Sequence, residues 1–108
     1  MNWIPLEQAA QLEAISALSY QKPVVLFKHS TRCSISIMAK GRLDRATQPE
    51  GVDFYYLDLL AFRPLSNQIA EQFAVHHESP QLILLKNGTC VYEAAHNGID
   101  MDELLTQL

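Results

Sequence analysis

The stretch from Pro23 to Ser36 constrains the fold more than any other part of the chain. Val24 to Phe27 is an uninterrupted apolar run, which is typical of a strand that helices cover on both faces. A polar turn follows, and Cys33 then stands at the expected start of a helix. The first amides of a helix lack intrahelical partners, and its aligned dipoles place partial positive charge there. We therefore expect Cys33 to be a reactive cysteine whose thiolate form is favoured.

The polar turn itself supports this expectation. Ser30 and Thr31 are residue types that cap helix N-termini, and Arg32 places a full positive charge next to the thiol. The sequence therefore predicts a short capped turn that presents the cysteine.

Composition limits the domain organisation and the partners. A chain of 108 residues with 48% hydrophobic content is expected to form one domain over residues 1–108. Its net charge of −4 offers no broad attraction to nucleic acid or to anionic membranes, so we expect neither as a partner.

The amino end and the short apolar runs predict a cytoplasmic location. The first residues contain no basic region or apolar run of a signal peptide, and no apolar run approaches the roughly 20 residues that span a bilayer. In a reducing compartment, two cysteines are more often free than joined in a structural disulfide. Two cysteines and four scattered histidines lack the paired spacing of a zinc site, so no metal site is expected.

Helix and strand patterns alternate through the first two thirds of the chain. Apolar residues recur every three positions between Leu6 and Leu18, and a second helical face runs from Ile35 to Ala46. Arg63-Pro64 opens a third helical pattern, which reaches Phe73. Val52 to Leu60 is aromatic and apolar enough for a second strand. Strands separated by helical crossovers predict a parallel core.

The pattern changes after residue 80. Gln81 to Lys86 is a strand pattern, Asn87-Gly88 is a strong two-residue hairpin signal, and Cys90 to Glu93 returns antiparallel. Asp100 is expected to cap a last helix that ends near Gln107. The sequence thus predicts an α/β fold of three α/β/α layers, in which helices flank a central mixed sheet of about four strands.

A cysteine that starts a helix after a buried strand, and a later hairpin preceded by Ser79-Pro80, resemble the thioredoxin superfamily. In that superfamily a cis-proline precedes the strand whose start faces the active-site cysteine, and Pro80 holds the matching position. Four segments narrow the resemblance to the monothiol bacilliredoxin family, the YtxJ-like general stress proteins. These segments cover residues 26–36, 63–67, 77–81 and 85–88, and the likeness extends over nearly the whole chain.

The chain departs from the family pattern at three positions. Ser34 stands where proline is usual in the motif, and Arg32 stands where threonine is usual. Asn97 stands where tryptophan is expected. Cys33 itself is retained.

The resemblance implies a monothiol thiol-disulfide oxidoreductase with Cys33 as its catalytic residue. Dithiol oxidoreductases carry a second cysteine one helical turn later, and here Ser36, whose hydroxyl cannot resolve a disulfide, holds that place. Cys33 is expected to take a small thiol, bacillithiol by resemblance, from a mixed disulfide on a client protein. Bacillithiol is then a co-substrate, no tightly bound cofactor is expected, and the protein is expected to be a monomer. The expected substrate-binding residues are Thr31, Arg32, Ser36, Ser79 and Pro80.

Two interpretations stay open for several side chains. His29 either caps the sheet or acts near the thiol, and His77 either faces the site or lies with His76 in a solvated loop. Ser36 either donates a hydrogen bond to the thiolate or only continues the helix.

Cys90 is expected to be inert core. The strand from Gln81 to Lys86 runs away from the site, and at 3.3 Å per residue Cys90 is still more than ~10 Å from Cys33 after the hairpin. Disulfides need Cα atoms within roughly 7 Å of each other.

Three other functions fit the same residues. The first is a glutaredoxin-like monothiol reductase that uses another small thiol. The second is a noncatalytic thioredoxin-like module that binds extended peptides beside Ser79 and Pro80. The third is an iron-sulfur carrier, which needs an external thiol and a second subunit to complete four thiolate ligands.

Overall fold

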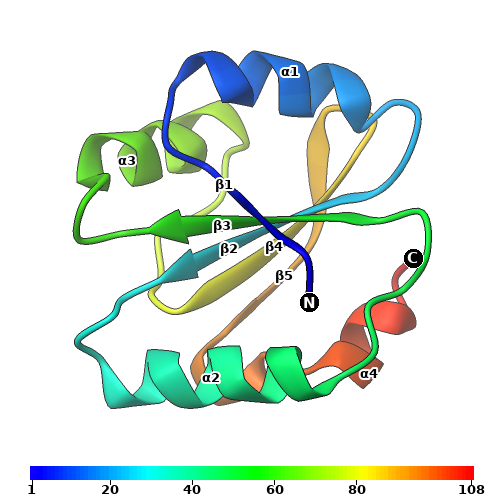
Figure 1. Cartoon of the computed structure of the whole chain (residues 1–108). Helices are drawn as coiled ribbons and strands as arrows, with labels where there is room; N and C mark the ends of the chain where they lie inside the picture. The colour runs from blue at the N-terminus through cyan, green and yellow to red at the C-terminus, as the bar shows by residue number, and fades with distance from the viewer.

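The computed structural model describes residues 1–108, and a five-stranded mixed sheet with helices on both faces is its centre (Figure 1). The strands are β1 (Trp3–Pro5), β2 (Val24–His29), β3 (Asp53–Asp58), β4 (Gln81–Lys86) and β5 (Thr89–Ala95), in the order β1-β3-β2-β4-β5. The helices are α1 (Ala10–Leu18), α2 (Ser34–Arg45), α3 (Arg63–Gln72) and α4 (Met101–Leu105), with a 3-10 turn η1 (His96–Gly98). The predicted α/β class, mixed sheet and layered order are confirmed.

The expected number of about four strands is corrected to five. Trp3–Pro5 adds an edge strand that pairs parallel to β3, with Ile4 opposite Tyr55. A strand of three residues is too short to show alternation in the sequence, and only its pairing with β3 defines it. The helix predicted from Leu6 begins at Ala10, because Leu6 still bonds to β3 through its amide and packs into the core.

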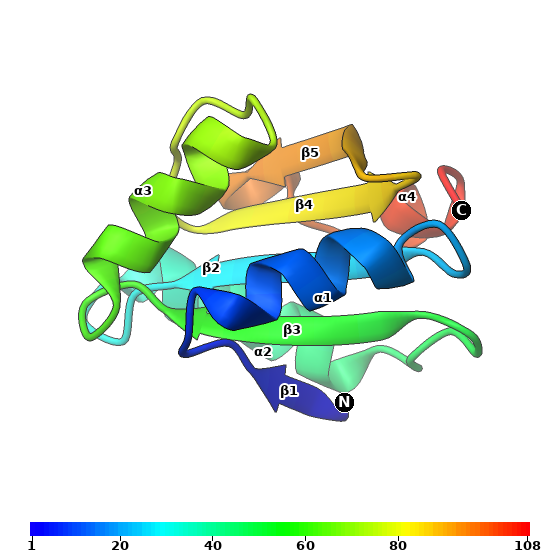
Figure 2. The ribbon, with the colours of Figure 1, turned by 90° about the horizontal axis from the view of Figure 1, so that it is seen from above.

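Helices α1 and α3 cover one face of the sheet, and α2 and α4 cover the other (Figures 1 and 2). All six residues of β2 are buried, as its uninterrupted apolar run predicts. Side chains alternate between the two faces of a strand, so Leu26 packs in the core beneath α1 and α3, whereas Phe27 packs in the core beneath α2. None of the four helices combines the length and the apolar character that crossing a bilayer requires.

Strand register brings the end of β2 next to the start of β4. β2 pairs parallel with β3 and antiparallel with β4, with Lys28 opposite Gln81. At the other end of the sheet, Asn87 and Gly88 both have positive φ values of 53° and 75°, as a two-residue hairpin turn requires. The predicted cap of the last helix is confirmed, because the Asp100 side chain accepts a hydrogen bond from the Glu103 amide.

Candidate functional site

Cys33 lies where the chain leaves β2 and enters α2. It is half-buried and forms the N-cap of α2, and its carbonyl oxygen accepts the Ile37 amide at 2.9 Å. The predicted capping by Ser30 and Thr31 is wrong, because the cap falls at Cys33 and no side chain there bonds the first-turn amides. Those amides and the helix dipole therefore face the region of the sulfur without a competing side-chain oxygen.

Ser36 organises the turn before Cys33. Its side chain is fully buried, its Oγ accepts the Ser30 amide at 2.9 Å, and the same Oγ lies 2.6 Å from His29 Nδ1. The hydroxyl thus joins the end of β2 to the first turn of α2. Its hydrogen bonds go to Ser30 and His29, and none reaches Cys33, which favours a role in holding the cysteine turn.

His29 closes the core at the end of the sheet, which is the first of the two roles considered for it. Its ring is buried, stacks on Phe27 at 5.8 Å between centroids, and lies 5.5 Å from the Tyr56 ring, so it closes the end of the core. It also contacts the hydroxyl of Ser36. Burial, and secondarily the positive charge of Lys40, lower the pKa of His29, so its imidazole is neutral at neutral pH.

We expect Ser36→Ala to destabilise the protein by about 1–3 kcal/mol, because the Ser30 amide and His29 Nδ1 lose their shared partner in a buried place. Urea denaturation followed by circular dichroism measures this change. Ser34→Ala is the matched control, since Ser34 is exposed and lies two positions earlier on the same helix. Equal midpoints for both variants contradict the structural role of Ser36.

Pro80 immediately precedes β4 and lies at the same end of the sheet as Cys33. The Ser79-Pro80 peptide bond is cis, as the resemblance implies. The Pro80 carbonyl oxygen accepts a hydrogen bond from the His96 amide at 3.1 Å, which brings η1 to this end of the sheet. Thr31 and Arg32 are exposed in the turn before Cys33, whereas Ser79 is half-buried. The structure therefore gathers the five predicted binding residues and Cys33 at one end of the sheet, with Ser36 beneath the surface.

Sequence reasoning missed how η1 is held. Arg42 on α2 donates hydrogen bonds to the carbonyl oxygens of Ile99, at 3.0 Å and 3.2 Å, and of His96, at 3.3 Å. These bonds tie the turn that carries Asn97 to the helix that begins after Cys33. Arg42 lies 57 residues from Ile99 in the chain, and no local signal announces the contact.

A second missed feature is a polar cluster around Lys28. Its side chain is fully buried, and its Nζ donates to the Ser66 carbonyl oxygen at 3.0 Å and lies 3.2 Å from His77 Nδ1. His77 fits neither of its two interpretations: it lies in a loop but is half-buried, and its Nδ1 contacts Lys28 and Ser66 and not Cys33. The available signal was the lysine itself, which interrupts a buried apolar strand.

Cys90 lies toward the opposite end of the sheet. It pairs with Leu85, which in turn pairs with Val24 at the start of β2, whereas Cys33 follows the end of β2. Both cysteines are free and both are half-buried, so Cys90 lies at the margin of the core and not within it as predicted. Burial raises the pKa of the Cys90 thiol, and Cys90 packs against the core beneath α1 and α3. It therefore has neither the position nor the thiolate character of a resolving cysteine.

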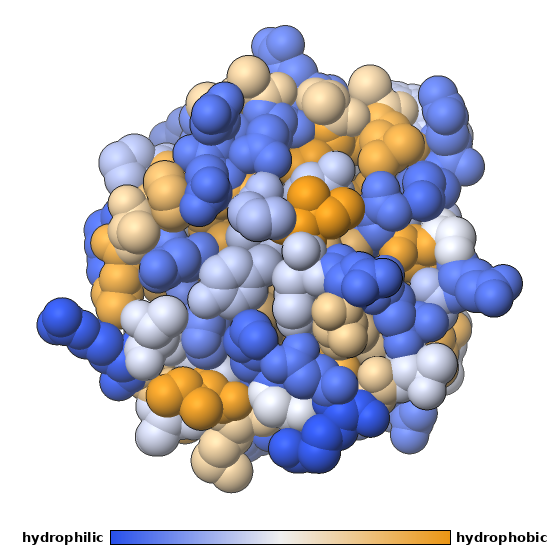
Figure 3. All heavy atoms as spheres, viewed as in Figure 1, coloured by the Kyte–Doolittle hydropathy of each residue, from blue (hydrophilic) through white to orange (hydrophobic).

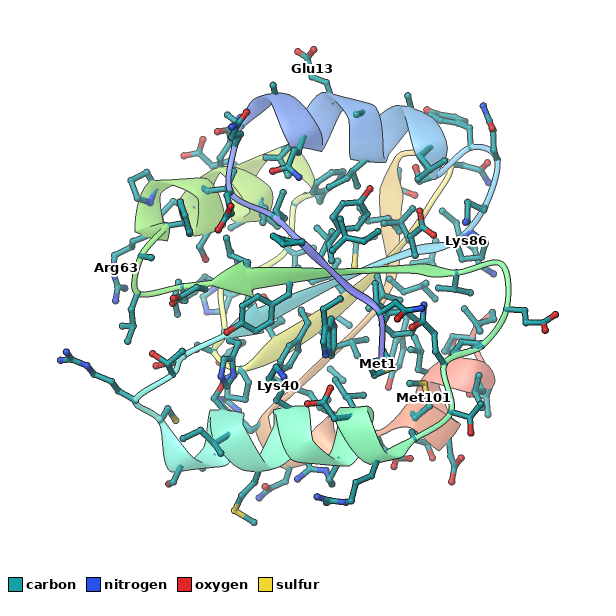
Figure 4. All side chains as sticks on the ribbon, in the orientation of Figure 1. Met1, Glu13, Lys40, Arg63, Lys86 and Met101 are labelled. Carbon is teal, nitrogen blue, oxygen red and sulfur yellow. The ribbon has the colours of Figure 1, made fainter.

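The surroundings of the site carry charge and scattered apolar groups. In Figure 4, Arg63 points outward at the start of α3, at the end of the molecule where the turn before α2 lies. Lys40 points from α2 toward the sheet. Lys40 binds Asp44 at 2.8 Å. Figure 3 shows apolar residues in separate small patches on the face that carries β1.

Comparison with known proteins agrees with this geometry. A solved structure provisionally described as an oxidoreductase with a thioredoxin fold is 32% identical, with a TM-score of 0.83, over 96% of this chain and 91% of its own. Fasciola hepatica thioredoxin is 19% identical, with a TM-score of 0.72, over 94% of this chain and 95% of its own. Spinach chloroplast thioredoxin f is 23% identical, with a TM-score of 0.67, over 94% and 86%. The two thioredoxins show the fold alone.

The sequence profile of the family described as monothiol bacilliredoxin BrxC matches residues 4–104, which is nearly the whole chain. The chain therefore belongs to the monothiol bacilliredoxin family and has the thiol redox role that this family and its thioredoxin-like oxidoreductase fold support.

Proposed function

We propose that this protein removes bacillithiol from mixed disulfides on client proteins, with Cys33 as its single catalytic thiol. The observation that carries the proposal is the isolation of Cys33. It stands half-buried at the start of α2, Ser36 occupies the place of a resolving cysteine, and Cys90 lies toward the far end of the sheet. A chain whose two thiols lie toward opposite ends of the sheet can exchange a small thiol at Cys33 but cannot close a disulfide between them.

The reaction is two successive thiol-disulfide exchanges. The Cys33 thiolate attacks the bacillithiol sulfur of the mixed disulfide, a disulfide forms between Cys33 and bacillithiol, and the client leaves as a thiolate that takes a proton from water. A second free thiol then attacks the bacillithiol sulfur and releases Cys33 as thiolate. The second thiol ends in a disulfide with bacillithiol, so each exchange conserves electrons and leaves the client reduced.

The proposed binding residues divide into two groups. Thr31 and Arg32 are exposed beside the thiol and would contact the small thiol, with Arg32 adding positive charge. Ser79 and Pro80 precede β4 and would contact an extended client segment through backbone groups. Ser36 acts from beneath, through the turn that it holds.

The proposal is tested with a short peptide whose cysteine carries bacillithiol, and with the same peptide carrying glutathione. We expect the protein to take up bacillithiol at least about tenfold faster than glutathione, and intact mass should locate one adduct on Cys33. Cys90→Ser should behave like the wild type. Equal rates with both thiols favour the glutaredoxin-like alternative, and no transfer with either favours a noncatalytic binding module.

A further inference from the structure

The polar cluster around Lys28 joins three segments that are far apart in the sequence. Lys28 lies on β2, five residues before Cys33, and its partner Ser66 lies in the first turns of α3. Its other partner, His77, lies three residues before Pro80. The three segments meet at one buried Nζ atom.

The hydrogen bonds define the state of each group. The Lys28 ammonium donates to the Ser66 carbonyl oxygen and to His77 Nδ1, which must then be the unprotonated ring nitrogen. Ser66 Oγ lies 3.3 Å from the same nitrogen. Burial, together with the charges of Lys28 and Arg63, lowers the pKa of His77, which agrees with a neutral acceptor ring.

A buried ammonium group without a carboxylate partner lowers the stability of the folded state, because its charge is desolvated without the compensation of an opposite charge. Lys28 is fully buried, and the lysine ion pairs of the chain involve other groups, Lys22 with Asp53 and Lys40 with Asp44. A methionine of similar length would fill the same space without desolvating a charge. Departures from good core chemistry of this kind are expected at functional sites, where positioning outweighs stability.

We propose that Lys28 is a positioning residue for client binding. Its ammonium group contacts His77 and thereby holds the segment from His77 to Pro80 in place at the end of the sheet where Cys33 lies. The bond to the Ser66 carbonyl anchors the same ammonium to α3. This inference rests on the proposed function, because it assigns the His77–Pro80 segment to the client. Lys28 does not touch the reacting sulfur, and its effect passes through the position of Pro80.

Two rates distinguish a loss of client positioning from a general loss of structure, which would change both rates together. The first is the reaction of Cys33 with the short peptide that carries bacillithiol, which needs the His77–Pro80 segment. The second is alkylation of Cys33 by iodoacetamide, which does not. We expect Lys28→Met to raise the KM for the peptide about tenfold, with kcat and the alkylation rate changed less than about twofold.

His77→Gln is the second variant, and it keeps the test valid if Lys28→Met fails to fold. His77 is half-buried in a loop, and glutamine offers a displaced acceptor to Lys28. We expect the same rise in KM, and the double variant should add little to either single variant because both break one connection. His76→Gln, at the exposed neighbouring histidine, is the matched control.

Two results would overturn the proposal. One is a KM for the peptide that neither variant changes, and the other is an equal loss of peptide reaction and of alkylation. A failure of the proposed function gives a different result, namely a wild-type protein that does not react with the thiolated peptide. In that case, noncovalent binding of the same peptide with serine in place of its cysteine is compared between wild type and Lys28→Met, and unchanged binding overturns the positioning role.

Discussion

Cys33→Ser is expected to reduce the transfer of bacillithiol from a peptide to the background rate, a loss on the order of 10³-fold or more. The reason is that a serine hydroxyl is not ionised at neutral pH, and its oxygen does not exchange with a disulfide. The fold should persist, because Cys33 is only half-buried and its backbone bonds to Ser30 and Ile37 do not involve the sulfur. Stopped-flow measurement of peptide reduction with mass analysis of the adduct checks this.

Cys90→Ser is the matched control for that substitution. It removes the other thiol, which donates to the Tyr92 carbonyl at 3.4 Å and lies against the core beneath α1 and α3. We expect its transfer rate to equal that of the wild type. Residual transfer in Cys33→Ser that disappears only in the double variant would show that Cys90 carries the reaction, against the strand register that separates the two cysteines.

Raising the pH from 7 to 10.5 is expected to stabilise the wild type relative to Lys28→Met by about 3 kcal/mol. Burial lowers the pKa of Lys28 to about 8 in the folded protein, against 10.5 as its ordinary value. Between these values the unfolded chain binds a proton that the folded protein does not, so the free energy of unfolding rises with pH. Below pH 8 both states are protonated, and the folded state carries the full cost of the buried charge.

Urea denaturation of both proteins between pH 7 and 10.5 measures this difference. Subtracting the free energy of unfolding of one protein from that of the other cancels the contribution of the other lysines and of the tyrosines, which the two proteins share. Lys86→Met is the control, because Lys86 is half-buried at the far end of β4 and its Nζ donates to the Gln107 carbonyl. A difference between wild type and Lys28→Met that stays constant with pH contradicts a costly buried ammonium.

Local signals were sufficient for much of the fold and for the central cysteine. The apolar run of β2, the hairpin at Asn87-Gly88 and the cap at Asp100 each act within a few residues, and each is found where the sequence predicts it. Cys33 at the start of α2 is likewise found where the local sequence predicts it. These features depend on backbone preferences and strand burial, which neighbouring residues largely determine.

The errors concern contacts that packing decides. Ser30 and Thr31 suit a cap by residue type, yet the N-cap of α2 is Cys33, and the Ser30 amide bonds to Ser36 instead. Strand β1 exists only because β3 offers it a parallel edge. Periodicity cannot show such choices, because they depend on which groups packing brings together.

The sequence alone determined the layered α/β architecture, the cysteine at the start of a helix and the lack of a resolving cysteine one turn after it, because residue type and local spacing suffice for these. Tertiary structure decided how that thiol is supported. Only the folded chain shows Ser36 holding the cysteine turn, Arg42 holding η1, and Lys28 joining β2 to α3 and to the segment before Pro80. The physical reason is that a buried polar group must find a hydrogen-bond partner, and that partner lies wherever the fold places it.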